Sequence, residues 1–484
     1  MHLILSAAEH TNRIRRLRRL LVAIVLFVVG VPSAAVAQQV TVVQTTANLH
    51  DALTVQAPQS FVAKRAPGST VIRVDPSVTY QRIIGFGGAM TDTSAWLLYD
   101  ELAPIWRDAT IAALFGPSGI ELNFVRIPIG ASDYTVSASP YSYDDQPPGR
   151  SDPTLADFSI AHDQAYIIPA LRQVLSVDPD VLTLASPWSP PPWMKANHSY
   201  DNNGLAGSVL PEDYPALAQY FVRFIQAYQA AGVPIDAITP MNEPSCSCTW
   251  PGAALTSAND ATFLPQYLAP ALGAAGLHPT IFGVDDTELS DAQALLSGGA
   301  ASTLGGIAFH CYKGMGQMSA LHQQYPSEPI FLDECSPGAI PYATAEVPID
   351  ATRNWASAVQ LWNLALDPSG GPFETIWGCP GCTGLVTVDE YTRTASFGLN
   401  YFQYGQTTKY VQPGAVRIFS TRQVSDGYGT TRGVDNVAFV NPDGSKVLVA
   451  YNNRARGVRL AIRWRGRYLN WRLPGRGTAT FIWR

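Results

Sequence analysis

The sequence predicts an α/β protein, a (β/α)8 TIM barrel with an attached antiparallel β-sandwich domain. Three observations lead to this fold class. From about residue 81 to residue 410, short apolar β-prone runs alternate with longer segments of helical period. Polar and aromatic residues gather where the short runs end, as at the C-terminal face of such a barrel. From Gly414 onward the hydrophobic period changes to two.

Eight apolar runs are the candidate barrel strands. We expect them to end at residues 85–87, 126–128, 185–187, 240–242, 284–285, 309–310, 332–333 and 361–362. Helical periodicity follows most of them, over residues 94–114, 162–176, 213–231, 262–275, 290–297, 316–324 and 394–409. An open, doubly wound sheet would show the same alternation. Its Gly-x-Gly-x-x-Gly fingerprint is missing after the first run, because Gly85-Phe86-Gly87-Gly88 resembles it only superficially.

The second domain is expected to draw on both ends of the chain. Residues 447–451 and 459–464 alternate as antiparallel strands do, with Gly and Asn turns between such runs. Residues 40–44 and 70–74 are also strand-like and have no helical segment nearby. The expected boundaries are therefore residues 38–80 for N-terminal strands that join the β-sandwich, 81–411 for the barrel, and 412–484 for the C-terminal β-sandwich domain.

Residues 1–37 have the order of a secretory signal peptide. Five arginines precede an apolar run over residues 20–31, and Ala35-Val36-Ala37 follows it. The run is shorter than the roughly 20 residues that a membrane-spanning helix needs. We expect cleavage near Gln38, a secreted protein in the extracellular space or periplasm, and no transmembrane segment after cleavage. An uncleaved N-terminal anchor is the alternative.

The charge is distributed unevenly. The chain has a net charge of −6 at pH 7, which argues against nucleic acid as a partner. Residues 413–484 nevertheless contain 13 Lys or Arg and only three Asp. This asymmetry predicts contact of the basic C-terminal domain with an anionic surface, such as a wall polymer or lipid headgroups. The alternative is a solvated basic sheet face that keeps the protein soluble.

Six cysteines in an exported chain predict disulfides. A local bridge is expected in the segment 379–382, which contains a Pro-Gly turn. Cys246 and Cys248 flank one residue of another loop, while Cys311 and Cys335 each lie beside a candidate catalytic residue. A zinc site built from the two close pairs is the alternative.

Two glutamates at strand ends are the candidate catalytic residues. Hydrolysis of a glycosidic bond with retention needs two carboxyl groups about 5 to 5.5 Å apart, one to protonate the leaving oxygen and one to attack the anomeric carbon. Glu243 follows the fourth strand and Glu334 ends the seventh, so both would face the barrel mouth. Asn242 can donate a hydrogen bond to the 2-hydroxyl of the sugar. For either glutamate alone, a helix N-cap or a salt bridge is the competing interpretation.

Aromatic residues gather at the same rim, where sugar rings could pack on them. They are Trp188, Trp193, Trp250, Tyr312, Trp362 and Trp377. His310 and Tyr312 share one face at strand spacing and could orient the nucleophile, although a core histidine would also fit. Asp285-Asp286 offers two carboxylates to a metal, but the sequence has neither His-Glu-x-x-His nor an acidic loop of calcium-binding spacing, so no metal or other cofactor is expected.

Several of these motifs, in order, resemble glycoside hydrolase family 30, the group of glucosylceramidases and endo-β-1,6-glucanases. The motifs are Gly85-Phe86-Gly87-Gly88-Ala89-Met90-Thr91-Asp92, Ala185-Ser186-Pro187-Trp188, Asn242-Glu243-Pro244 and Trp362-Asn363-Leu364-Ala365-Leu366. The resemblance implies a barrel fused to a β-sandwich, a retaining mechanism and no cofactor. It makes Glu243 the acid/base and Glu334 the nucleophile. It also implies a glycone site at Arg126, Asp133, Trp188, Asn242, His310, Tyr312 and Trp362. Apart from the resemblance, the rim aromatics Trp193, Trp250 and Trp377 are the candidate aglycone contacts.

Three departures leave the aglycone open. Cys311 stands where glucosylceramidases usually have a bulky aromatic, the surroundings of Glu334 in Asp333-Glu334-Cys335 differ, and residues 377–383 form an insertion with two cysteines. The hypothesis is a secreted retaining β-glycosidase that acts on β-glucosidic bonds of β-1,6-glucan or glucosylceramide-type substrates, so a carbohydrate or a glycolipid is the expected partner. A related β-xylosidase, β-fucosidase or galactanase is an alternative, as is a non-catalytic carbohydrate-binding wall protein with a dead barrel.

Overall fold

The computed structural model describes residues 38–484 except residues 138, 373–378, 380 and 423–432. The expected signal peptide, residues 1–37, lies outside the described residues. The chain from Gln38 to Arg484 is one compact unit.

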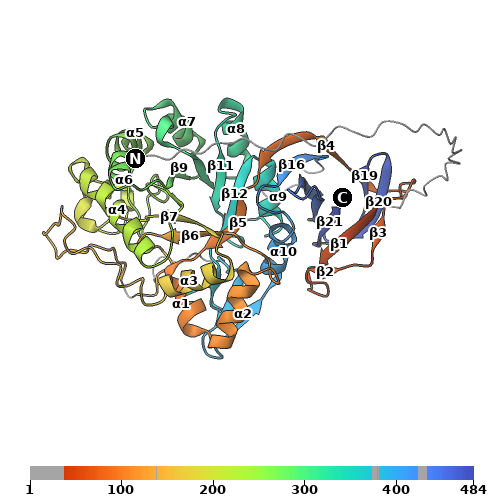
Figure 1. Cartoon of the computed structure of the whole chain (residues 1–484), viewed down its shortest axis with the longest axis horizontal. Helices are drawn as coiled ribbons and strands as arrows, with labels where there is room; N and C mark the ends of the chain where they lie inside the picture. Colours follow the sequence, from red (N-terminus) through yellow and green to blue (C-terminus); the bar gives the residue numbers. More distant parts are fainter. Residues whose placement is uncertain (1–37, 138, 373–378, 380, 423–432) are drawn as a thin grey trace, which may run out of the picture. The chain divides into compact units, whose positions relative to one another are not determined.

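Eight parallel strands close into a barrel, which confirms the predicted fold class (Figure 1). The strands are β5 (Gly85–Ala89), β6 (Phe124–Pro128), β7 (Leu182–Ser186), β8 (Ala237–Ile238), β9 (Thr280–Asp286), β10 (Gly306–His310), β11 (Ile330–Glu334) and β12 (Ala356–Leu361). All eight expected runs become barrel strands. The fourth ends at Ile238 and not at residues 240–242, because Pro240 has no N–H to donate and the N–H of Asn242 bonds the carbonyl of Pro187 at 2.8 Å.

Helices follow the strands around the barrel. They are α1 (Asp92–Trp96), α2 (Pro104–Phe115), α3 (Ile167–Val177), α4 (Tyr214–Ala230), α5 (Ser257–Phe263), α6 (Ala269–Ala274), α7 (Leu289–Ser297), α8 (Gly316–Gln324), α9 (Glu346–Arg353) and α10 (Leu399–Thr408). Two π-helical segments, Leu97–Glu101 and Leu264–Leu268, continue α1 and join α5 to α6.

Three helix predictions need correction. The segment 94–114 is interrupted at Leu102, whose backbone is extended before Pro104 starts α2. Residues 394–397 form a strand, and the helix starts only after Gly398. Helix α9 was not predicted; its eight residues include Pro348 and three charged side chains, which obscure the apolar signal of a helix in the sequence.

The second sheet has ten strands, and both ends of the chain contribute to it. They are β1 (Gln39–Thr45), β2 (Thr54–Val55), β3 (Gln59–Ser60), β4 (Thr70–Arg82), β16 (Val416–Ser420), β17 (Val434–Val440), β18 (Lys446–Asn452), β19 (Val458–Trp464), β20 (Arg467–Leu473) and β21 (Thr478–Trp483). Strand β1 pairs with β21, and the long strand β4 pairs with β16 and β19. Most pairs are antiparallel, but β4 and β19 run parallel.

A small third sheet lies beside the barrel and was not predicted. It comprises β13 (Ala365–Leu366), β14 (Val386–Asp389) and β15 (Thr394–Phe397). Its first strand follows the end of β12, so it extends the loop that carries Trp362.

Strand periodicity places the polar site directly above an apolar layer. Seven buried residues, each from a different barrel strand, form a separate apolar cluster: Phe124, Leu184, Ala237, Phe282, Ala308, Phe331 and Ala358. Residues two positions later share the same face of each strand. Arg126, Ser186 and His310 are such residues, and all three are buried. Along these strands an apolar inward-facing residue is followed two residues later by a polar one, which places charged side chains at the C-terminal mouth of the barrel.

Candidate active site

A pocket of about 380 Å³ opens at the C-terminal ends of the barrel strands. Its lining residues are Asp133, Trp188, Asn242, Glu243, Cys246, Trp250, Tyr312, Glu334, Trp362, Cys379 and Cys382. Seven of them are site residues expected from the sequence, and Trp250 is an expected rim residue. The fold therefore brings together residues separated by as many as 249 positions, the interval between Asp133 and Cys382.

The two candidate catalytic carboxyl groups lie close together. One carboxylate oxygen of Glu243, one of Glu334 and a ring nitrogen of His310 all lie within 4.8 Å of one another. This spacing matches the roughly 5 to 5.5 Å of retaining glycosidases and is well below the roughly 6.5 to 9.5 Å that an inverting enzyme needs for its water.

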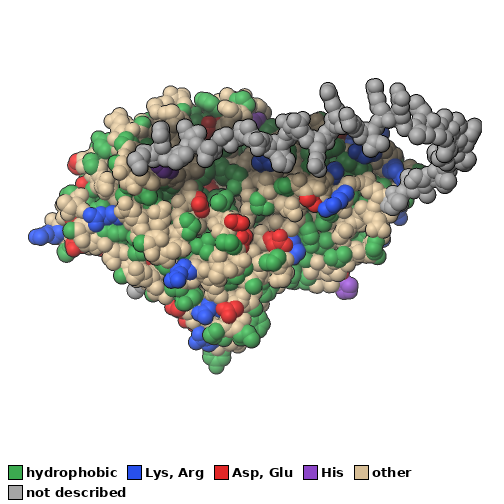
Figure 2. All heavy atoms as spheres, in the orientation of Figure 1, with side chains coloured by type: hydrophobic (Ala, Val, Ile, Leu, Met, Phe, Trp, Pro, Cys, Tyr) green, Lys and Arg blue, Asp and Glu red, His purple; other side chains and the backbone are tan. Residues whose placement is uncertain are grey.

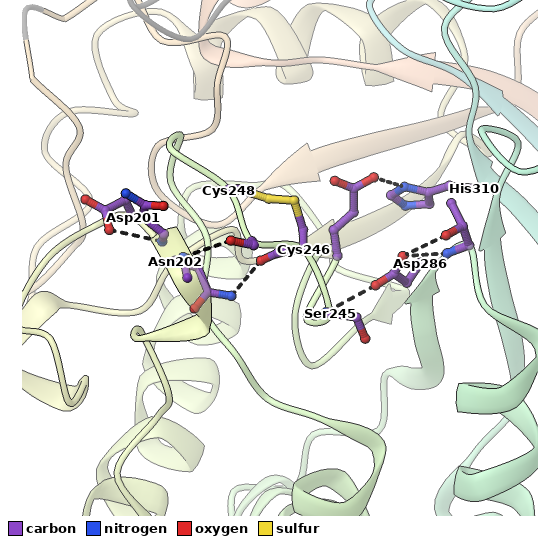
Figure 3. Close-up of a disulfide and its surroundings, with 12 residues drawn as sticks. Asp201, Asn202, Ser245, Cys246, Cys248, Asp286 and His310 are labelled. Carbon is purple, nitrogen blue, oxygen red and sulfur yellow. Dashed lines mark hydrogen bonds and ion pairs between the residues drawn. A yellow bond between two sulfur atoms is a disulfide. The ribbon is translucent and has the colours of Figure 1, made fainter.

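Glu243 is held by its own backbone and by His310. Its φ is 43°, its N–H donates to the carbonyl of Asp285 at 2.8 Å, and its carbonyl accepts the N–H of Cys246 at 2.9 Å. The adjacent Cys246–Cys248 disulfide closes this loop, and Asn202 donates its side-chain N–H to the carbonyl of Cys246 at 2.8 Å (Figure 3). The side-chain oxygen Oε1 of Glu243 lies 2.9 Å from Nδ1 of His310. The loop therefore aims this carboxyl into the pocket.

Glu334 is held at both oxygens. Arg126 donates from Nη1 to Oε2 at 2.5 Å, and the hydroxyl of Tyr312 donates to Oε1 at 2.7 Å. A register shift between Phe309 and His310 places Glu334 opposite His310 in the β10–β11 ladder. The Cys311–Cys335 disulfide joins the same two strands next to both residues.

Arg126 is the central cation of the site and is fully buried. Its Nη2 donates to Asn242 Oδ1 and to Asp285 Oδ1, both at 2.7 Å, and its guanidinium carbon lies 4.7 Å from the centre of the Trp188 ring. Burial lowers its pKa, but the charges of Asp285 and Glu334 outweigh burial and raise it. Arg126 is therefore charged at every working pH and forms an ion pair with Glu334.

His310 joins the two halves of the site. Its Nδ1 faces Glu243, and its Nε2 lies 2.8 Å from Asp285 Oδ1. Burial lowers the pKa of His310, but the charge of Glu334 and the hydrogen bonds to Asp285 and Glu243 raise it well above its usual value. We infer an imidazolium that donates from both nitrogens.

Two aspartates behind the pocket belong to this network but were not predicted as site residues. Asp285 is fully buried and also accepts from the Thr239 hydroxyl at 2.5 Å; burial raises its pKa, but Arg126 and His310 lower it far more. Burial and the charge of Asp285 raise the pKa of the neighbouring Asp333 well above its usual value, so Asp333 is protonated and can donate to Asp285. Asp285 was considered in the sequence only as a metal ligand, although its place at a strand end was the relevant signal.

The remaining predicted residues line the walls or lie outside the pocket. Trp188 and Trp362 stack at 5.1 Å on one wall, and Asp133 lies in the same pocket. Burial, together with the charges of Glu334 and Glu243, raises the pKa of Asp133 well above its usual value. Trp193 is a correction, because it is buried away from the pocket and donates its indole N–H to the carbonyl of Asp144 at 3.0 Å. Trp377 lies outside the described residues.

The charges of the site do not suit a metal ion. Glu243, His310 and Glu334 are close enough to share a ligand, as are Asp285, His310 and Asp333. However, both nitrogens of the imidazolium already donate hydrogen bonds, and Arg126 supplies a buried cation to the same carboxylates. The zinc alternative for the cysteine pairs is also wrong, because all six cysteines form disulfides: Cys246–Cys248, Cys311–Cys335 and Cys379–Cys382.

Within the described part of the chain, every helix is too short or too polar to cross a bilayer.

Comparisons with known proteins agree with this geometry. The model of the glycosyl hydrolase family 30 TIM-barrel domain matches residues 83–377, and the model of the family's β-sandwich domain matches residues 414–481. The endo-1,6-β-D-glucanase BGN16.3 of Trichoderma harzianum is 33% identical over 389 residues, which cover 77% of this chain and 78% of that protein. The lysosomal acid glucosylceramidase of Mus musculus is 27% identical over 456 residues, covering 87% and 85% of the two chains. The solved structure of the endo-β1,6-glucanase BT3312 is 28% identical and superposes with a TM-score of 0.80 over 92% of this chain and 99% of that one.

Proposed function

This chain belongs to glycosyl hydrolase family 30 and is a glycoside hydrolase, and from that premise we propose that it is a secreted, retaining enzyme that cleaves β-1,6-glucan. The observation that carries the retaining mechanism is that one carboxylate oxygen of Glu243 lies within 4.8 Å of one carboxylate oxygen of Glu334. The choice of glucan follows the curated relatives named endo-1,6-β-D-glucanase, which are 31–33% identical to this chain, against 27% for the mouse glucosylceramidase.

In the first step, Glu334 attacks the anomeric carbon while Glu243 gives its proton to the departing oxygen. The bond between that carbon and the leaving oxygen breaks, and the sugar becomes esterified to Glu334. Because Nδ1 of His310 donates to Oε1 of Glu243, the other oxygen of Glu243 is available to carry the transferred proton. Arg126 and Tyr312 each bind one carboxylate oxygen of Glu334 and so hold this carboxylate in the orientation that attack requires.

In the second step, Glu243 takes a proton from water, and the water oxygen attacks the anomeric carbon from the face that the leaving group vacated. The ester bond to Glu334 breaks and its carboxylate is restored. Two inversions at one carbon give a product with the configuration of the substrate.

The pocket walls suit a glucose unit. Trp188 and Trp362 offer a stacked aromatic wall for the C–H face of a sugar ring, while Asp133 and Asn242 offer polar partners for its hydroxyls. Trp250 and two disulfide-bonded loops, at Cys246 and at Cys379 and Cys382, line the same pocket. We propose that these residues form the aglycone side, where the next sugar of the glucan binds.

The mechanism is tested with two glutamine variants. Glu334→Gln is expected to abolish turnover of every substrate, because no nucleophile remains. In Glu243→Gln, kcat/KM is expected to fall roughly 10²- to 10⁴-fold for substrates with poor leaving groups. The same variant is expected to form the glycosyl-enzyme at the normal rate from substrates with activated leaving groups. Equal loss with both kinds of substrate would remove Glu243 as the acid. Proton NMR of the first-formed product must show the β-anomer; initial α-product would refute retention.

The substrate and the secretion are tested separately. Product analysis is done on linear β-1,6-glucan, β-1,3-glucan, xylan, galactan and glucosylceramide, with Glu334→Gln as the inactive control. We expect oligosaccharides from β-1,6-glucan, whereas faster release of glucose from glucosylceramide would assign the lipid-linked substrate.

For secretion, the protein recovered outside the cell should begin near Gln38; a chain that retains residues 1–37 would contradict signal cleavage.

A further inference from the structure

Strands β4, β19 and β20 lie side by side in the second sheet (Figure 1), and their outer face carries a concentration of arginines. Arg73, Arg459, Arg463 and Arg472 are exposed and share this face, and Arg465 follows in the exposed turn between β19 and β20. We name these five residues the arginine face. We propose that the arginine face is a second carbohydrate-binding site, separate from the barrel, and that its ligand is an acidic polysaccharide.

The four strand arginines occupy one face because of the sheet register. Arg459 lies opposite Arg472 in the antiparallel β19–β20 pair, and Arg463 lies opposite Arg73 in the parallel β4–β19 pair. Arg459 and Arg463 are four residues apart on one strand and so share a face, at a spacing of about 13 Å. The intervening Leu460 and Ile462 point inward and are fully buried.

Both cross-strand pairs join like charges. Like charges directly opposite each other destabilise a sheet, and neutral polar residues would serve equally well on a solvated surface. The two pairs therefore lower stability without a gain in folding. An anionic ligand bound between the two arginines of a pair would attract both and offset their mutual repulsion.

The described residues supply few counter-charges at this face. Arg73 pairs with Asp75 at 2.5 Å, but among the described residues Arg459, Arg463, Arg465 and Arg472 form no ion pair with a carboxylate. Over the barrel in Figure 2, by contrast, Lys and Arg side chains are interspersed with Asp and Glu. The arginine face thus has the unbalanced positive field that attracts polyanions.

A pocket of about 380 Å³ lies at one end of the arginine face. Strand β4 pairs with β19 through Arg73 and with β16 from Val74 onward, so the chain leaves an opening beside the turn at Arg465. Arg73, Arg463 and Arg465 line this opening together with Asp75. Because Asp75 pairs with Arg73, the guanidinium groups of Arg463 and Arg465 are the two left for the carboxylate or sulfate group of a sugar residue.

The surroundings favour a polysaccharide over a membrane. Tyr468 lies opposite Arg463 on the same face and offers a ring on which a sugar can pack. Of the described residues in β19 and β20, none is an exposed large hydrophobic side chain that could insert among lipid chains. A sheet also presents its arginines in rows about 4.8 Å apart, which suits an extended polymer with regularly spaced acidic groups. The site would hold the enzyme on an acidic matrix while the barrel acts on a neutral glucan.

The test measures binding of the full mature chain to polygalacturonate, with neutral dextran as the comparison polymer. The variant Arg459→Gln/Arg463→Gln removes two charges of the arginine face, and the control Arg150→Gln/Arg172→Gln removes two exposed charges from the barrel. The proposal expects the Kd for polygalacturonate to rise at least about 10-fold in the first variant and less than about two-fold in the control. Binding must also weaken as the salt concentration rises.

Three outcomes would overturn the proposal. Wild-type protein could fail to prefer polygalacturonate over dextran, both double variants could weaken binding equally, or phosphatidylserine vesicles could bind the arginine face more tightly than polygalacturonate does. The last result would assign the face to a membrane. Misfolding is separated from lost binding by urea denaturation, since removing like charges from β19 should leave the free energy of unfolding unchanged or higher.

Discussion

Asp285 is the predicted organiser of the catalytic site, and its replacement gives the sharpest test of the network. It accepts from Arg126 at 2.7 Å, from His310 at 2.8 Å and from Thr239 at 2.5 Å, all inside the protein. In Asp285→Asn the neutral amide keeps the shape but removes the counter-charge of two buried cations. Removing one partner of a buried ion pair costs about 3–5 kcal/mol of unfolding free energy.

The protonated neighbour Asp333 should reduce this loss. Its pKa is raised by burial and then by the charge of Asp285, so in Asp285→Asn it can ionise and become the new counter-charge. Its oxygens lie 3.8 Å from Arg126 Nε and 3.9 Å from His310 Nε2, which is too far for full replacement. We therefore expect a loss of about 3 kcal/mol, at the lower end of that range. We also expect a fall in kcat/KM of about 100-fold, because Arg126 no longer holds Glu334 in place.

The same reasoning predicts strong non-additivity. Asp333→Asn alone should be nearly neutral, since the native side chain is already uncharged. The double variant Asp285→Asn/Asp333→Asn should lose more than the sum of the two single variants, with a coupling energy of about 1–3 kcal/mol. Urea denaturation and steady-state kinetics on an aryl β-glucoside measure both quantities.

Asp286→Asn is the matched control, because it makes the same chemical change one residue later. Asp286 accepts backbone N–H groups from Thr287 at 2.6 Å and from Ser245 at 3.2 Å and has no ion pair with Arg126 or His310 among the described contacts. If Asp285→Asn and Asp286→Asn had the same unfolding free energy and the same kcat/KM, or if the double variant were additive, the network would not organise the site.

Three further predictions concern buried polar groups outside the pocket. Burial and the charges of Asp350 and Glu346 raise the pKa of Asp435 to about 8, so the folded protein keeps a proton that the unfolded chain releases above about pH 4. The free energy of unfolding should therefore fall between pH 4 and pH 8 by up to about 1.4 kcal/mol per unit, and Asp435→Asn should flatten this slope in urea titrations at pH 5 and pH 7; an unchanged slope would exclude Asp435 as its source. Asp92→Asn should raise KM about 10-fold and also lower the unfolding free energy, because buried Asp92 accepts the N–H of Val136 at 3.0 Å in the loop that carries Asp133 and pairs with His162 at 2.5 Å; kinetics identical to wild type would refute the role in positioning this loop. Lys195→Met should lower the unfolding free energy by at least about 2 kcal/mol, since the Lys195 ammonium is hydrogen-bonded to four oxygens from two active-site loops; an unchanged urea midpoint would show that water replaces it.

The sequence could predict the architecture because barrel strands and helices have different hydrophobic periods. Each expected strand formed, and polar residues at strand ends, such as Glu243 and Glu334, lie at the mouth. The same local signals could not locate α9 or the strand at residues 394–397, where a proline or a neighbouring sheet determined the conformation.

The sequence by itself determined which residues stand at strand ends, since apolar runs and their polar termini are local properties of the chain. Only the tertiary structure decided how those ends meet. The register shift that faces Glu334 toward His310, the proton held by Asp333 and the burial of Trp193 away from the pocket all depend on contacts between segments far apart in the sequence. Electrostatic and packing energies of that kind arise only when the strands close into the barrel, because a charge buried beside its neighbours interacts far more strongly than the same charge in water.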